Sequence, residues 1–329
     1  MGFLISFLGA SIPALFYAGI LYWLDRYEKE PLRLIGGVFL WGGMIASLGA
    51  FILNTLSGTG LLFISRSEVF SEAAVAVITA PVIEEVLKGL AVLFVMLSFY
   101  SEFDSILDGI IYSGITALGF AAAENTYYIY QYGYLESSWL GLKNMFILRS
   151  LILGWTHPFY TAFTGIGLAI HRITPRSPRK YTAPIVGLLL AIFTHSVHNL
   201  IVTFLPNIAG SLLLILWDWV GWMGILGVII WATARERQRM RTHLEEEVQR
   251  GTISSEQYRV AISAWKQVLA RIRSIPRQQL HQTHRFFQLC GDLCHKKHQA
   301  LLRHSQEERA KHISAIREEI ALLSNALTL

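Results

Sequence analysis

The chain has 329 residues, of which 53% are hydrophobic and 16% carry charged side chains, and its formal net charge is +5. This composition excludes an ordinary soluble protein of the same length. Apolar runs of about 20 residues, long enough to cross a bilayer as helices, recur along the sequence. We therefore predict an all-α fold, a polytopic membrane helical bundle with a cytoplasmic helical C-terminal tail.

About seven transmembrane helices are expected, and they cover residues 3–24, 35–56, 73–98, 106–129, 147–170, 182–204 and 211–233. Basic residues gather in the loops after the first, fifth and seventh spans, which lie on one side in a seven-helix count. The positive-inside rule places that side in the cytoplasm, with the N-terminus outside and the C-terminus inside. The prediction divides the chain into a transmembrane domain, 1–233, and a basic cytoplasmic tail, 234–329.

The third span is interrupted by Glu84, Glu85 and Lys88, which lie in the middle of an apolar run. A charge at the bilayer centre costs at least about 2.5 to 3.5 kcal/mol, so such residues normally face a bundle interior or a wet cavity and mark function. On a helix Lys88 can reach either acid, whereas the two acids point about 100° apart. We predict that one glutamate pairs with Lys88 and the other is free for chemistry. A purely structural ion pair between helices is the alternative.

Small residues and an acid mark the fourth span. Gly114, Gly119 and the alanines at 121–123 allow another helix to approach closely. Glu124 follows them, towards the outer end of the span. It is therefore either an acid at a packed interface or, as the plainer alternative, a glutamate at the membrane boundary.

Three of the four histidines in residues 1–233 fall inside predicted spans. His157 precedes Pro158 in the fifth span, where we expect the proline to bend the helix beside a cavity. His195 and Asn199 in the sixth span are four residues apart and face the same way. Imidazoles with a carboxylate are the usual ligands of a catalytic zinc. The spacing differs from the helical His-Glu-x-x-His pattern, so it does not by itself identify a metal site.

Taken in order, these segments resemble the PrsW family of bacterial intramembrane proteases, which is related to the CAAX-protease and bacteriocin-processing superfamily. The resemblance extends over about residues 20–205 and rests on motifs carried by separate helices. These motifs are the loop Asp25–Pro31, Glu84-Glu85-x-x-Lys88, Asp108-Gly109-Ile-Ile-Tyr112, Gly119-Phe120-x-x-x-Glu124-Asn125, His157 and His195-x-x-x-Asn199.

The resemblance implies an intramembrane endopeptidase in the inner membrane of a bacterium. Its substrate would be a membrane-anchored protein cut near the extracytoplasmic side, for example in the first cleavage of an anti-sigma factor or a similar regulator. Catalytic roles are implied for Glu84, Glu85, Lys88 and Asn199. One of the glutamates would take a proton from the attacking water, and the amide would donate to the developing oxyanion.

The resemblance leaves two mechanisms open, one that depends on glutamates alone and one that depends on zinc. In the second, the zinc ligands are expected to be Glu124, His157 and His195, which would hold the metal or polarise the carbonyl. Lys88 would hold one of the paired glutamates in either mechanism.

The tail after residue 233 has a soluble composition, with 17 Lys and Arg against 10 Asp and Glu from Arg235 onward. Apolar residues after Pro276 recur with helical spacing, so we expect amphipathic helices that pack together. Cys290 and Cys294 are expected to be free thiols. The tail could bind a cytoplasmic protein partner or self-associate. No nucleic-acid partner is expected, because acids dilute the positive charge.

Two other functions are compatible with buried acids and histidines. A proton- or ion-coupled transporter also places such residues near the midplane, although no internal repeat is evident in this sequence. A non-catalytic membrane scaffold or sensor, acting through the tail, would need them only for packing. Cleavage retained in Glu84→Gln and Glu85→Gln would favour the scaffold, and transport in vesicles would favour the carrier.

Overall fold

The structure is a computed structural model that describes residues 1–25, 27, 29–302 and 307–327, and over these residues it contains helices and no strand. The helices are α1 Gly2–Leu24, α2 Leu32–Leu40, η1 Trp41–Ala46, α3 Ser47–Ser65, α4 Glu68–Ala74, η2 Val75–Thr79, α5 Ala80–Ser98, α6 Ile106–Tyr128, η3 Ile129–Tyr134, α7 Leu135–Met145, η4 Phe146–Ile152, α8 Thr156–Ile173, α9 Pro178–Phe204, α10 Ile208–Gln249, α11 Ser255–Ala261, α12 Ala264–Ser274, α13 Leu280–Leu302 and α14 Glu307–Ala326. Those labelled η are π-helical turns. The all-α prediction is confirmed.

The chain forms two compact units. The first contains residues 1–24 and 30–229, and the second contains residues 25–29 and 230–329. The change of unit falls inside α10, which runs without a break from Ile208 to Gln249. The functional division at residues 233 and 234 stays a prediction.

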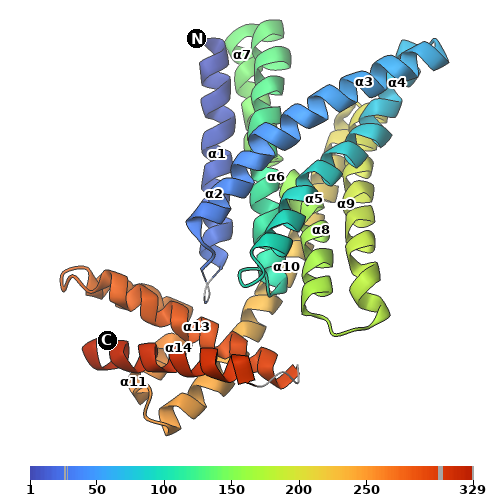
Figure 1. Ribbon diagram of the computed structural model, residues 1–329. Coiled ribbons are helices and arrows are strands. Elements are labelled where there is room, and N and C mark those ends of the chain that lie inside the picture. Colours follow the sequence, from blue (N-terminus) through green and yellow to red (C-terminus); the bar gives the residue numbers. More distant parts are fainter. Residues whose placement is uncertain (26, 28, 303–306, 328–329) are drawn as a thin grey trace. The chain divides into compact units, whose positions relative to one another are not determined.

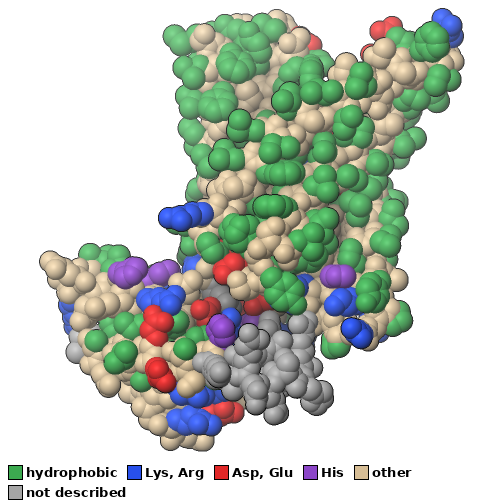
Figure 2. Space-filling view, in the orientation of Figure 1, with side chains coloured by type: hydrophobic (Ala, Val, Ile, Leu, Met, Phe, Trp, Pro, Cys, Tyr) green, Lys and Arg blue, Asp and Glu red, His purple; other side chains and the backbone are tan. Residues whose placement is uncertain are grey.

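Helix α6 lies at the centre of the first unit. It packs against α1 on one side and α8 on another, and α8 in turn packs along α9 (Figure 1). Large apolar side chains cover much of the face of the unit that Figure 2 shows. The exposed apolar residues of this unit include Phe51, Leu56, Phe94 and Leu97. An exposed apolar surface of this extent is typical of a protein surrounded by lipid. The first unit is thus an integral membrane bundle.

Within the described residues, five helical stretches are long and apolar enough to cross a membrane, namely Gly2–Leu24, Leu32–Ser65, Ile106–Ile173, Pro178–Phe204 and Ile208–Gln249. The predicted third span, which carries three ionisable residues, is not among them, and Ile106–Ile173 contains two predicted spans. Six of the seven predicted spans lie entirely within helical segments, and the fifth is interrupted at residues 153–155. The number of crossings stays a prediction.

Glycines bring the central helices into backbone contact. A Cβ on Gly109 of α6 would lie 2.3 Å from the carbonyl oxygen of Gly165 on α8, and one on Gly119 would lie 2.0 Å from that of Phe39. Only a residue without a side chain fits at such distances, as is common where membrane helices cross. The close approach expected at Gly119 is therefore confirmed.

Several predicted spans depart from regular α-helix, and two of these departures lie beside candidate site residues. The fifth is broken at residues 153–155, so His157 and Pro158 lie in the first turn of α8, where proline is tolerated because the first amide groups of a helix have no partner in it. The expectation that Pro158 bends a continuous helix was therefore wrong. In the third, the π-helical turn η2 precedes Pro81, which has no amide hydrogen to donate to the preceding turn.

The second unit has a hydrophobic core of its own. Residues from α10, α11, α12, α13 and α14 build it, among them Leu244, Phe286 and Ile320, each fully buried. Cys290 and Cys294 are buried in this core as thiols that form no disulfide within the described residues. The predicted packing of amphipathic helices in the tail is confirmed.

Candidate active site

Glu85 is the anchor of a polar network inside the first unit. It is fully buried and accepts hydrogen bonds from Lys88 Nζ at 2.5 Å, Thr161 Oγ1 at 2.8 Å and His195 Nδ1 at 3.0 Å. The donors come from α5, α8 and α9. Lys88 is also fully buried, so the charge of each residue is balanced by the other. The predicted pairing of one glutamate with Lys88 falls on Glu85, whose oxygens are thereby occupied.

Glu84, one residue earlier on α5, is in a different condition. Its Oε1 accepts only a long hydrogen bond of 3.4 Å, from Asn54, and its Oε2 is buried without any hydrogen-bond partner. An unsatisfied carboxylate oxygen away from water costs several kcal/mol. Such an atom needs a proton, a water or a cation beside it. Of the two adjacent glutamates, Glu84 is therefore the one whose carboxylate is not held by Lys88.

His195 on α9 connects the two glutamates. Its Nδ1 bonds to Glu85, which leaves Nε2 with the lone pair, and Nε2 faces Oε2 of Glu84 at 3.8 Å. A lone pair and a carboxylate oxygen repel each other across such a gap unless a positive species or a hydrogen-bond donor lies between them. In a metal-ligating histidine, the ring nitrogen that does not bind the metal usually donates to a carboxylate, as Nδ1 of His195 does here.

His157 on α8 repeats this arrangement with another acid. Its Nε2 lies 2.8 Å from Oε2 of Glu124, and its Nδ1 lies 3.4 Å from Nζ of Lys88. The rings of His157 and His195 are 5.4 Å apart between centroids and nearly perpendicular. Each histidine thus has its own carboxylate, Glu124 for His157 and Glu85 for His195.

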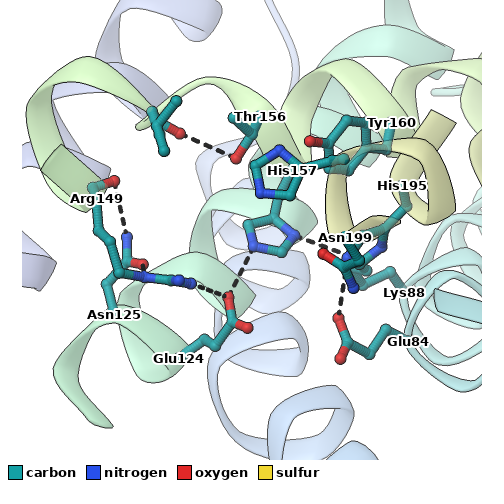
Figure 3. A network of polar contacts seen from close by, with 12 residues as sticks. Glu84, Lys88, Glu124, Asn125, Arg149, Thr156, His157, Tyr160, His195 and Asn199 are labelled. Carbon is teal, nitrogen blue, oxygen red and sulfur yellow. Dashed lines mark hydrogen bonds and ion pairs between the residues drawn. The ribbon is translucent and has the colours of Figure 1, made fainter. Parts of the chain in front are cut away.

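Glu124 is held by a cation that the sequence reasoning missed. Arg149 donates from a terminal nitrogen to Glu124 Oε2 at 3.0 Å and from Nε to Asn125 Oδ1 at 2.9 Å (Figure 3). The signal was present in the sequence, because Arg149 is the only Lys, Arg, Asp or Glu in the predicted span 147–170.

Asn199 lies one turn beyond His195 on α9, as its spacing predicted. Its amide donates to the carbonyl oxygen of Ala76 at 2.8 Å. Ala76 belongs to the π-helical turn η2, where the regular α-helical hydrogen bonds are lost. One of the two amide hydrogens of Asn199 is used in this way, and the second remains available.

Glu84, His157 and His195 form one group. One ligand atom of each residue lies within 4.8 Å of the others, and all three residues are buried. Figure 3 shows them converging from α5, α8 and α9. Two imidazoles and one carboxylate are a donor set of catalytic zinc sites, and the unpartnered Glu84 oxygen is the atom that a cation would satisfy. The residues present therefore fit a metal. Glu124 as a ligand stays a prediction.

A second polar group, also missed by the sequence reasoning, lies beside this one. Asp218 on α10 accepts hydrogen bonds from Tyr160 on α8 and His198 on α9. Asp218 is the only ionisable residue in the predicted span 211–233, so the rule that drew attention to Glu84 applied to it as well.

Comparison with known proteins is consistent with this site. The family described as "PrsW family intramembrane metalloprotease" matches residues 30–239. A "Protease PrsW" of Geobacillus kaustophilus is 29% identical over 213 residues, which cover 65% of this chain and 81% of the relative. One of Clostridioides difficile is 30% identical over 59% of this chain and 78% of the relative, and one of Bacillus subtilis is 24% identical over 59% and 81%. No solved structure matches the chain.

Proposed function

Because the chain belongs to the PrsW family of intramembrane metalloproteases, we propose that Glu84, His157 and His195 hold its catalytic metal and that this metal is zinc. The protein is an intramembrane endopeptidase, and its substrate is a membrane-anchored protein. The observation that carries the ligand assignment is the buried oxygen of Glu84, which has no partner and faces the free nitrogen of His195.

Zinc in such a site supplies a Lewis acid that polarises the scissile carbonyl and makes water a stronger nucleophile. The protein supplies the orientation of the ligands. Glu85 fixes the ring of His195 through Nδ1, and Glu124 fixes that of His157 through Nε2, as carboxylates do behind ligating histidines. The nitrogen of His157 left for the metal is Nδ1, which lies 3.4 Å from Nζ of Lys88, so that contact would be given up when metal binds. Lys88 and Arg149 hold these two carboxylates in place.

Proton transfer falls to Glu84 in this proposal. The oxygens of Glu85 are occupied, because they accept three hydrogen bonds. Oε2 of Glu84, in contrast, accepts no hydrogen bond. With Oε2 of Glu84 holding the metal, Oε1 of the same carboxylate, which accepts only the long hydrogen bond from Asn54, is the oxygen that would take a proton from the attacking water. The second amide hydrogen of Asn199, one turn from His195, is the donor we assign to the developing oxyanion.

The remaining expectations concern the cell rather than the site. We propose a bacterial inner membrane, an external N-terminus and a cytoplasmic C-terminus, on the strength of the basic loops. Cleavage near the extracytoplasmic side, in an anti-sigma factor or a similar regulator, is part of the same proposal. The helices of the second unit would bind a cytoplasmic partner or a second copy of the chain.

The test compares wild type with Glu84→Gln and a matched control, Glu72→Gln, which changes an exposed glutamate on α4 in the same way. Each is reconstituted in liposomes with a panel of single-span fusion proteins, and both cleavage and zinc per chain are measured. We expect Glu84→Gln to lose cleavage and most of its zinc, and the control to keep both. Zinc retained in Glu84→Gln would remove Glu84 from the ligands. Wild-type cleavage that survives complete removal of metal would overturn the zinc proposal.

A further inference from the structure

A buried acid on α10 is not used by the mechanism above. Asp218 is 3% exposed, and it lies in the apolar part of a helix that crosses the first unit. An acid in such a place is costly, and it is normally retained for function rather than for packing. Its contacts therefore indicate what it does.

Both carboxylate oxygens of Asp218 are engaged. The hydroxyl of Tyr160 on α8 donates to Oδ1 at 2.7 Å, and Nδ1 of His198 on α9 lies 2.8 Å from Oδ2. One acid thus connects α10 to the two helices that carry His157 and His195. Hydrogen bonds to an ionised acceptor are about twice as strong as neutral ones.

Tyr160 passes this constraint on to the candidate ligands. Its ring is fully buried and stacks on the ring of His195, with centroids 4.9 Å apart and planes inclined by 19°. The ring of the same tyrosine also meets that of His157, with centroids 6.0 Å apart and planes inclined by 73°. A tyrosine whose hydroxyl is fixed cannot tilt or slide. The orientation of His195 is therefore fixed by two contacts, because Glu85 holds its Nδ1 and the ring of Tyr160 packs against its face.

The neighbours of Asp218 keep α10 at this position. The indole nitrogen of Trp217 donates to the carbonyl oxygen of Thr194 at 3.4 Å, and that of Trp219 donates to the carbonyl oxygen of Ile152 at 3.1 Å. Three consecutive residues of α10 therefore bond to three different segments. These bonds fix the position of Asp218, along the axis of α10, relative to α8 and α9.

We propose that Asp218 is a positioning residue of the peptidase, which acts through Tyr160 to hold the imidazole of His195 in the orientation needed at the reacting centre. The inference rests on the proposed role of His195. It adds α10 to the helices that support the candidate ligands, which already include α6 through Glu124.

The test is a double-mutant cycle with Asp218→Asn and Tyr160→Phe, assayed on the cleaved member of a panel of single-span fusion proteins. Asn keeps the size of the side chain but removes its charge, and Phe keeps the ring but removes the hydroxyl. Each single change is expected to lower kcat by about 10- to 100-fold with little change in KM, the usual effect of losing a residue that orients a ligand. The double variant should lose no more than the larger single loss, because both changes break the same contact.

A second readout does not depend on turnover. The rate at which a chelator removes zinc from each variant should rise by about the same 10- to 100-fold in Asp218→Asn and in Tyr160→Phe. Tyr181→Phe, which removes the hydroxyl of an exposed tyrosine at the start of α9, is the matched control and should behave as wild type.

Three results would overturn the proposal. Losses in kcat that multiply in the double variant would mean that Asp218 does not act through Tyr160. Unchanged kcat and chelation rate with a lowered thermal midpoint would show a purely structural acid. Non-additivity with His198→Asn instead of Tyr160→Phe would transfer the role to His198. If His195→Ala cleaves normally, the proposed site itself has failed, and that outcome is distinct from these three.

Discussion

Nδ1 of His195 lies 3.0 Å from Oε1 of Glu85, a residue 110 positions earlier in the chain. This contact fixes the tautomer of the histidine and turns its other nitrogen towards Glu84. In the proposed mechanism the two adjacent glutamates have different roles, since Glu85 supports His195 and Glu84 takes part in the reaction. The predictions below follow from this division.

Loss of Glu85 should damage both folding and activity, because it leaves Lys88 charged and buried without its partner. We expect Glu85→Gln to destabilise the first unit by about 3 to 5 kcal/mol, the usual cost of breaking a buried pair. Adding Lys88→Met should restore most of the stability, measured by unfolding in detergent, but not the cleavage. Full cleavage in the double variant would contradict the role of Glu85 in orienting His195.

Arg149 should matter to catalysis although it lies behind Glu124. Arg149→Gln removes the cation from Glu124 and frees that carboxylate to move, so we expect kcat to fall by about 10-fold or more. Arg179→Gln, an exposed arginine in the first turn of α9, is the matched control. Equal activity of the two variants would show that Arg149 only anchors the membrane boundary.

The contact between Gly109 and Gly165 should be intolerant of a methyl group. A Cβ on Gly165 would lie 2.0 Å from the carbonyl oxygen of Gly109, so Gly165→Ala must push α6 and α8 apart. We expect a loss of about 1 to 3 kcal/mol of stability and a weaker contact between Glu124 and His157. Gly19→Ala on α1, where a Cβ meets nothing within 4 Å, should cost little. Equal thermal midpoints for the two variants would contradict the tight packing of α6 on α8.

The second unit should lose stability in acid through Glu247. Burial raises the pKa of this carboxyl, but hydrogen bonds from Arg317, Lys297 and Thr252 outweigh it and lower the pKa to about 2. Because the folded pKa is below the ordinary value of 4.5, the stabilisation is present above that value and is lost as the pH falls towards 2. Hydrogen exchange at residues 312–326 of the whole chain should therefore accelerate over this range. In Glu247→Gln the acceleration should be smaller, and an unchanged profile would contradict the prediction.

Much of the site could be predicted from local spacing. The interval between Glu85 and Lys88 is one turn of helix, and so is that between His195 and Asn199, and both pairs lie as expected. Spacing could not decide which glutamate Lys88 would choose, because that choice depends on Thr161 and His195 from other helices.

Other features required the tertiary structure. The break before His157 lies where Gly154 packs against the ring of Tyr17 on α1, and no residue pattern placed it at residues 153–155. Arg149 and Asp218 are a different case. Each is an isolated charge in an apolar span, and the rule applied to Glu84 would have identified both.

The central claim is that two histidines and Glu84 hold the catalytic metal, and X-ray absorption at the zinc edge of the purified, zinc-loaded protein tests it most directly. The account predicts one zinc per chain with two imidazole nitrogens at roughly 2.0 to 2.1 Å, the remaining ligands being oxygen. One imidazole should disappear in His195→Ala. Sulfur ligands, which would place the zinc at Cys290 and Cys294, or a wild-type spectrum without paired imidazoles would contradict the account.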